Sequence, residues 1–137
     1  MKGSVLLVED DTRIRSIYAY LLVQAGYTVI EAASVATALM HLNALDLSCI
    51  VLDLKLPNGH GRRVVEELQS KRDDVPVVVL SGHYSDGDWD FPVVAVLQKP
   101  PAPVALVEAV EKASSQADAI REIRNSTRRL RGITGVL

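Results

Sequence analysis

Five short apolar runs recur along the chain, and most of them are followed by a stretch with helical spacing. Each run is four or five residues long, which is too short for a buried helix and typical of a strand covered on both faces. Strands that alternate with helices predict a parallel sheet with helices on both sides, the three-layer doubly wound α/β architecture. The predicted strands are residues 5–8, 27–30, 49–52, 77–80 and 93–97.

The segments between these strands differ in how clearly they show a helical pattern. Residues 12–25, 35–44 and 62–70 have apolar side chains at helical spacing, and each links one strand to the next. Residues 83–92 are instead polar, rich in Asp and interrupted by Gly. The fourth helix is therefore expected to be shortened or irregular.

The last helix is predicted to be longer than the sheet requires. Its periodicity begins near Val104 and continues to Leu130, before Gly132 and Gly135 break it. The spacing is close to the three-and-four alternation of a helix-pairing seam, which favours self-association or partner docking. A helix packed back on the domain or a frayed tail fits the sequence equally well. The seam comprises Ala113, Ala117, Ile120, Ile123, Thr127 and Leu130.

Composition and charge narrow the functional classes. The 137 residues suit one globular domain, here residues 1–117, followed by a helical extension, residues 118–137. There is no apolar run of the ~20 residues that a membrane span needs, and the lone Cys49 cannot form an internal disulfide, so a cytoplasmic protein is expected. The domain holds ten basic and fifteen acidic residues, whereas the extension holds five Arg and two acids. Nucleic acid is thus not an expected ligand.

Polar side chains follow four of the five predicted strands. Because parallel strands end at the same edge of a sheet, these side chains should lie close together. Grouped carboxylates repel one another unless a cation neutralises them, and an all-oxygen cluster suits Mg²⁺. A carboxylate beside Mg²⁺ can attack a phosphoryl group, while a Lys and a Ser can bind its oxygens. The residues are Glu9, Asp10, Asp11, Asp53, Ser81 and Lys99.

The loop after the third strand supports a functional role for Asp53. A lone Asp at a strand end is most often a helix cap or a solvated side chain. Here Pro57, Asn58, Gly59 and Gly61 follow it and predict a tight turn. The other strand-end residues then favour a shared site over a cap.

Over residues 4–117 the sequence resembles the response-regulator receiver domains of two-component signalling. The matching segments are V-L-L-V-E-D-D, V-L-D-L-K-L-P-N-G-H-G, V-V-V-L-S-G and L-Q-K-P. The resemblance implies a flavodoxin-like fold with strand order 2-1-3-4-5. It also implies a Mg²⁺-dependent phosphoacceptor that receives its phosphoryl group from a histidine kinase or a histidine phosphotransfer protein, and that is not otherwise an enzyme. A Lys99–Pro100 peptide bond in the cis form would match the family.

The resemblance assigns a role to each site residue. Asp53 would be the phosphoacceptor, with Ser81 binding the phosphoryl group and Lys99 pairing with it. The metal would be held directly by Asp10, by Asp53 and by the backbone carbonyl of Lys55. Glu9 would act on the metal through water.

Two departures from the family concern how a signal leaves the domain. Val96 occupies a position where the family usually carries Tyr or Phe, and the fourth-helix region is shortened. Val96 is interpreted as core packing. Lys55 and His83 match positions that tune loss of the phosphoryl group, although either fits a solvated loop residue.

Three other functions remain open from the sequence. The chain could be a scaffold or dimerisation module indifferent to phosphate, the receiver fragment of a longer regulator, or a phosphatase with an Asp nucleophile. The phosphatase is less favoured because Lys55 stands where a general acid is wanted. No metal-ligand spacing links His41, His60 and His83, and the tail arginines are interpreted as the solvated face of the helix.

Overall fold

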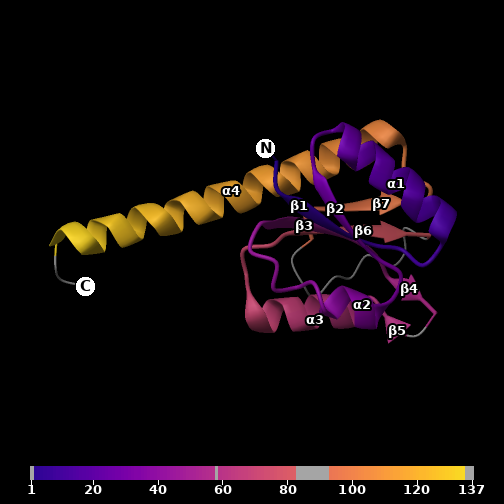
Figure 1. Cartoon of the computed structure of the whole chain (residues 1–137), viewed down its shortest axis with the longest axis horizontal. Coiled ribbons are helices and arrows are strands. Elements are labelled where there is room, and N and C mark those ends of the chain that lie inside the picture. The colour runs from indigo at the N-terminus through magenta and orange to yellow at the C-terminus, as the bar shows by residue number, and fades with distance from the viewer. Residues whose placement is uncertain (1, 58, 83–92, 135–137) are drawn as a thin grey trace.

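The computed structural model describes residues 2–57, 59–82 and 93–134, which form a parallel sheet between two layers of helices (Figure 1). The sheet order is β2-β1-β3-β6-β7, with every pairing parallel, which confirms the predicted doubly wound fold. The strands are β1 (Ser4–Val8), β2 (Thr28–Ala32), β3 (Leu47–Asp53), β6 (Val77–Ser81) and β7 (Ala95–Gln98).

The helices divide between the two faces of the sheet. Since successive side chains of a strand point to opposite faces, Val5 and Leu7 of β1 pack with α1 and α4, whereas Leu6 and Val8 pack with α2 and α3. All four side chains are fully buried. The helices are α1 (Thr12–Gln24), α2 (Val35–Leu39), α3 (Arg62–Lys71) and α4 (Pro103–Thr134).

The end of α1 follows from its sequence. Gly26 has a φ of 102°, a left-handed conformation that favours glycine. Its N–H donates to the Val23 carbonyl and the next N–H, of Tyr27, donates to the Leu22 carbonyl. These two bonds form a Schellman motif, which satisfies carbonyls left open at the helix end.

Two predicted helix boundaries are wrong. Helix α2 ends at Leu39, and turns replace the helix expected to residue 44: the N–H groups of Met40 and His41 donate to carbonyls three residues earlier instead of four. Arg72 binds the Leu42 and Ala44 carbonyls in these turns. Helix α4 passes through Gly132 to Thr134, because one glycine costs a helix only about 1 kcal/mol. The fourth helix expected in 83–92, together with His83, Asn58 and Gly135, lies outside the described residues.

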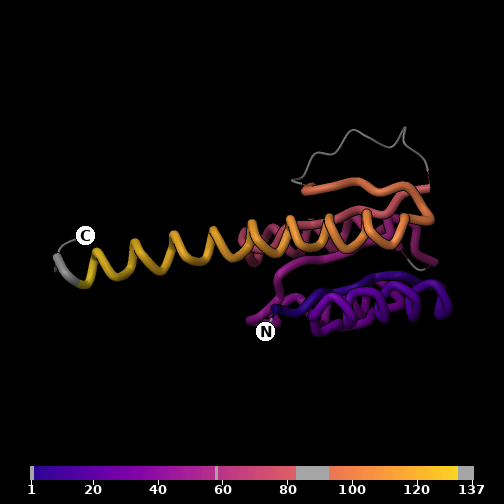
Figure 2. The backbone as a smooth tube through the Cα atoms, turned by 90° about the horizontal axis from the view of Figure 1, so that it is seen from above, coloured from indigo at the N-terminus to yellow at the C-terminus, as the bar shows by residue number. Residues whose placement is uncertain are grey.

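Helix α4 continues well beyond the body of the molecule (Figure 2). It is fastened where it leaves the sheet. Arg121 donates to Asp74 at 3.2 Å and to the carbonyl of Leu47, and Arg124 pairs with Asp73. Two of the arginines interpreted as a solvated face therefore fix the direction of the helix. Among the described residues, no helix has both the length and the apolar character to cross a membrane.

Candidate functional site

The sheet brings the predicted polar residues to one edge. Asp53 is the last residue of β3 and pairs in register with Leu80 of β6, so Ser81 lies one step further along that edge. Ser81 pairs with Gln98 of β7, which places Lys99 just beyond. Glu9 directly follows β1. The four strand ends therefore converge as the parallel topology requires.

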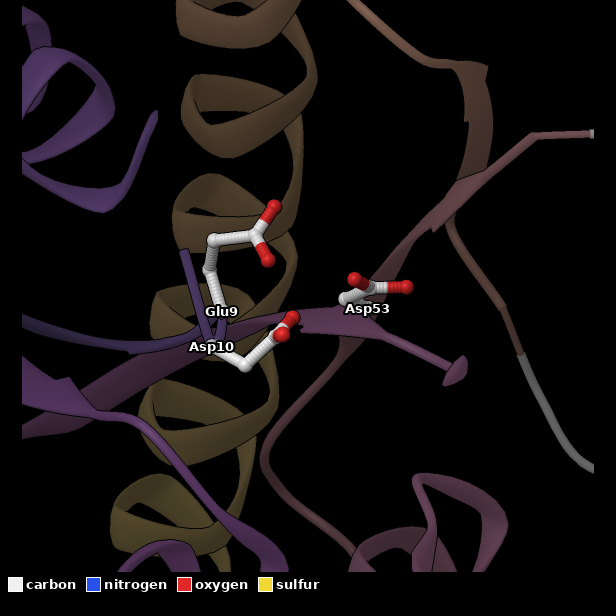
Figure 3. A group of neighbouring side chains, drawn as sticks. All are labelled: Glu9, Asp10 and Asp53. Carbon is white, nitrogen blue, oxygen red and sulfur yellow. The ribbon is translucent and has the colours of Figure 1, made fainter. Parts of the chain in front are cut away.

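Three carboxylates meet at this edge. Glu9, Asp10 and Asp53 each offer an oxygen, and these oxygens lie within 4.8 Å of one another (Figure 3). Glu9 is only 1% exposed and Asp53 is 5% exposed, whereas Asp10 is open to solvent. Two acids are thus held out of water beside a third, an arrangement that requires a nearby cation.

Lys99 supplies a positive charge inside the cluster. Its Nζ lies 2.8 Å from Asp53 Oδ2, to which it donates a hydrogen bond, and 2.9 Å from Glu9 Oε1. Burial alone would lower the pKa of Lys99, but pairing with Asp53 and Glu9 outweighs burial and raises it. The amine is therefore a fixed cation. The Lys99–Pro100 peptide bond is cis, as expected.

Glu9 adds a buried carboxylate oxygen to the cluster. Burial raises the pKa of its carboxyl; the Lys99 ammonium opposes that effect, and Asp10 and Asp53 reinforce it. Its Oε1 is buried and has no hydrogen-bond partner, since the Lys99 contact is an ion pair without hydrogen-bond geometry. Oxygen donors of this kind fit Mg²⁺, with Glu9, Asp10 and Asp53 as the residues that would hold it.

The loop after β3 orients Asp53. The Oδ1 atom of Asp53 accepts a hydrogen bond from the Lys55 N–H at 3.1 Å. Further along the loop, the Gly61 N–H donates to the Leu54 carbonyl at 2.8 Å. A Cβ on Gly61 would lie 2.6 Å from the Asp53 carbonyl oxygen. Only glycine allows this close approach. The predicted turn is a small antiparallel hairpin of β4 (Lys55–Leu56) and β5 (Gly59–His60).

An open cavity of about 490 Å³ lies over the carboxylates. Predicted site residues line it: Asp10, Asp53, Lys55, Ser81 and Lys99. His60 and Arg62 line it as well, although the sequence did not single them out for this site. The β4–β5 hairpin returns them to Asp53, and His60 Nδ1 accepts a hydrogen bond from the Arg62 N–H. The strong turn signal at 57–61 was the only indication that the chain doubles back there.

Asp11 has a different role from its neighbours. Its Oδ1 accepts hydrogen bonds from the N–H groups of Arg13 and Ile14 at 2.9 and 3.0 Å, which makes it the N-cap of α1. The expectation that Asp11 joins the strand-end cluster is therefore wrong. Val96 packs against the core formed with α2 and α3, in agreement with its interpretation as a packing residue.

The comparison with known proteins agrees with this geometry. Residues 5–111 match the family described as the response regulator receiver domain. The chain belongs to that family. This receiver domain is 28% identical over 134 residues to the C4-dicarboxylate transport transcriptional regulatory protein DctD of Rhizobium meliloti, covering 91% of this chain and 28% of DctD. It is 32% identical over 113 residues to the transcriptional regulatory protein FixJ of Azorhizobium caulinodans, covering 77% of this chain and 52% of FixJ.

A solved structure shows the same fold. The receiver domain of the hybrid histidine kinase CckA is 30% identical, with a TM-score of 0.71, and the match covers 82% of this chain and 99% of that one. The present chain therefore spans a whole receiver domain, but only about half or less of the length of DctD and FixJ.

Proposed function

We propose that this receiver domain accepts a phosphoryl group on Asp53 from a histidine kinase or a histidine phosphotransfer protein and signals through altered binding of other proteins. The observation that carries the proposal is the Glu9–Asp10–Asp53 cluster with Lys99 bridging two of its members. Carboxylates are seldom buried together unless the site serves a purpose.

The transfer step balances with residues of this chain. A carboxylate oxygen of Asp53 attacks phosphorus as the bond between phosphorus and the donor nitrogen breaks. The leaving imidazole keeps that electron pair and takes up a proton. Lys99, already 2.8 Å from the Asp53 carboxylate, remains beside the incoming negative charge, and Ser81 offers a hydroxyl from the neighbouring strand end. Asp10, Asp53 and the Lys55 carbonyl, with Glu9 acting through water, would hold a Mg²⁺ ion that would supply additional charge neutralisation.

On this proposal the chain is a phosphoacceptor that assists its own modification and is not otherwise an enzyme. Lys55 follows Asp53 by two residues and lines the cavity. An Asp-based phosphatase generally uses a second carboxylic acid at this place as its general acid, and Lys55 stands there instead, which weakens that alternative. A cytoplasmic location accompanies the proposal because the partner kinases act on cytoplasmic receivers.

The test is phosphorylation by acetyl phosphate, read by intact mass with Mg²⁺ or with chelator. The wild-type protein should gain one phosphoryl group only with Mg²⁺, and Asp53→Asn should gain none. Uptake by Asp53→Asn equal to that of the wild type would refute the assignment. A phosphate-indifferent scaffold would show no uptake by either protein.

The projecting part of α4 favours a further role in protein association. Ile123 is 67% exposed and Leu130 is 60% exposed on this helix, which is unusual for side chains of their size. We include in the proposal a homodimer formed through this helix. A longer regulator that contains this receiver domain would associate through the same exposed side chains of α4.

A further inference from the structure

Two large apolar side chains that α4 exposes, Ile123 and Leu130, lie on one side of the helix, whereas Val104, which is also exposed, lies near the start of the helix outside this side. At 100° per residue, Ile120, Ile123, Thr127 and Leu130 fall within one stripe, here called the α4 seam. Thr127 donates its hydroxyl to the Ile123 carbonyl at 3.0 Å. That bond satisfies the polar group within the helix and leaves the threonine methyl for contact. The seam thus presents exposed apolar side chains along the part of α4 that projects beyond the body, whose course is seen in Figure 2.

This seam continues into a cavity of the body. A cavity of about 400 Å³ lies beside the point where α4 leaves the sheet. Ile120 forms part of one wall, and Val65 and Leu68 of α3 with Val93 and Val94 before β7 are among the other apolar residues of the lining. Polar residues complete the lining: Gln69, Arg72, Asp73, Asp74 and Gln116. The apolar surface therefore runs from the helix tip into a hollow large enough for a leucine side chain.

The spacing of the four α4 seam residues is the same read in either direction. The four positions are symmetric about residue 125, so an antiparallel helix centred there places Ile120 opposite Leu130 and Ile123 opposite Thr127, in both directions. We propose that two copies of this chain pair through antiparallel α4 seams, with Leu130 of each copy entering the cavity beside Ile120 of the other. Such a two-fold interface is closed and self-complementary.

Charge selects the antiparallel over the parallel arrangement. Residues 124–134 contain four Arg and no acid, whereas residues 116–126, which would lie opposite them in this antiparallel pair, contain two acids, Asp118 and Glu122, and two Arg. Parallel helices would place the two arginine-rich ends side by side. Antiparallel helices avoid this repulsion and bring each arginine-rich end to Asp118 and Glu122 of the other copy, whose Arg121 and Arg124 are already paired with Asp74 and Asp73.

Ion pairs with the body hold α4 in a fixed direction before it pairs with a second copy. Arg121 and Arg124 are held by Asp74 and Asp73 on the side of α4 that faces the body. The direction of the projecting helix is therefore fixed before any contact forms, so little ordering is needed on association. The inference deepens the helix-mediated association proposed above and is independent of phosphorylation at Asp53.

Single-cysteine variants test the register directly. In an antiparallel pair Ile120→Cys and Leu130→Cys should form a disulfide dimer when the two proteins are mixed under mild oxidation. Each variant alone should not, because like residues are offset by ten positions, about 15 Å along the axis, well beyond the roughly 7 Å limit between Cα atoms in a disulfide. The wild-type protein is the blank, because its only cysteine, Cys49, is buried. Asn125→Cys, on the opposite side of α4, controls for random collision.

Each result of the cross-linking experiment either supports or overturns the antiparallel pairing. A cross-link in the mixture alone supports it. Cross-links of each variant alone indicate a parallel pair, and no cross-link above the Asn125→Cys control indicates no pair; either result overturns it. Sedimentation of the unmodified chain gives a second readout, because added salt should weaken an antiparallel dimer and strengthen a parallel one. Leu130→Asp should sediment as a monomer, with Asn125→Asp unchanged, and both variants should take up phosphate normally.

Discussion

Asp74 is predicted to be the main acid-sensitive support of α4. Its carboxylate is 8% exposed. Arg72 donates to it from Nε at 3.0 Å and from Nη2 at 3.1 Å, and Arg121 Nε donates at 3.2 Å. The fork of Arg72 is the main cause that lowers the pKa of Asp74 from 3.8 to about 2; burial opposes it and Arg121 adds to it.

The size of the effect follows from linkage. A pKa lowered in the folded state means that folding favours the ionised carboxylate. The stability it provides is therefore complete above the unfolded pKa, near pH 4, and is lost as the pH falls towards 2. A shift of this size corresponds to ~2 kcal/mol. The larger costs seen for fully buried ion pairs are not expected, since both arginines are partly exposed.

The assay is urea unfolding followed by circular dichroism between pH 7 and pH 2, for wild type and Asp74→Asn. The variant should be less stable by ~2 kcal/mol at pH 7, and the difference should shrink mostly between pH 4 and pH 2. Asp73→Asn is the matched control, since Asp73 is an exposed carboxylate paired with Arg124, and its loss should change stability little. Equal stability of wild type and Asp74→Asn at pH 7, or a difference independent of pH, would refute the reasoning.

Three further predictions separate the roles of neighbouring residues. Asp11→Ala should lower stability by about 1 kcal/mol through loss of the α1 cap and keep Mg²⁺ affinity, whereas Asp10→Asn should weaken Mg²⁺ binding in calorimetry and raise the melting temperature in chelator. Gly61→Ala should destabilise the fold by about 1–3 kcal/mol and slow phosphorylation, because its Cβ would meet the Asp53 carbonyl; Gly132→Ala, where a Cβ meets nothing within 4 Å, is its control. Lys99→Met should lower the melting temperature in chelator by leaving Glu9 and Asp53 without a cation, and an unchanged value would contradict the role given to Lys99.

The sheet and most of the site were predictable because they depend on local patterns. Apolar runs fix which segments lie in the core, and parallel topology then brings Asp53, Ser81 and Lys99 to one edge without further information. The capping role of Asp11 was not predictable, since the sequence shows three consecutive acids but not at which of them the chain enters α1. The same is true of His60, which reaches the cavity through the β4–β5 hairpin.

The turns after α2 and the course of α4 involve contacts distant in sequence. Arg72 binds carbonyls of these turns, 28 and 30 residues earlier. Arg121 and Arg124 fasten α4 to acids about 50 residues away. Periodicity indicates that these helices exist, but not which side chains across the fold will bind their ends. The arginines of the tail were therefore interpreted as solvated when two of them hold the helix in place.

The central claim, that Asp53 is the phosphoacceptor, is tested most directly by locating the acyl phosphate in the chain. After phosphorylation with Mg²⁺, borohydride reduction converts a phosphorylated aspartate to homoserine, which peptide mass spectrometry identifies at residue level. The structure predicts homoserine at position 53, no homoserine at positions 10 or 11, and no 5-hydroxynorvaline, the reduction product of a phosphorylated glutamate, at position 9. A reduced residue at another acid with position 53 unchanged, or no reduced residue despite phosphate uptake, would contradict the account.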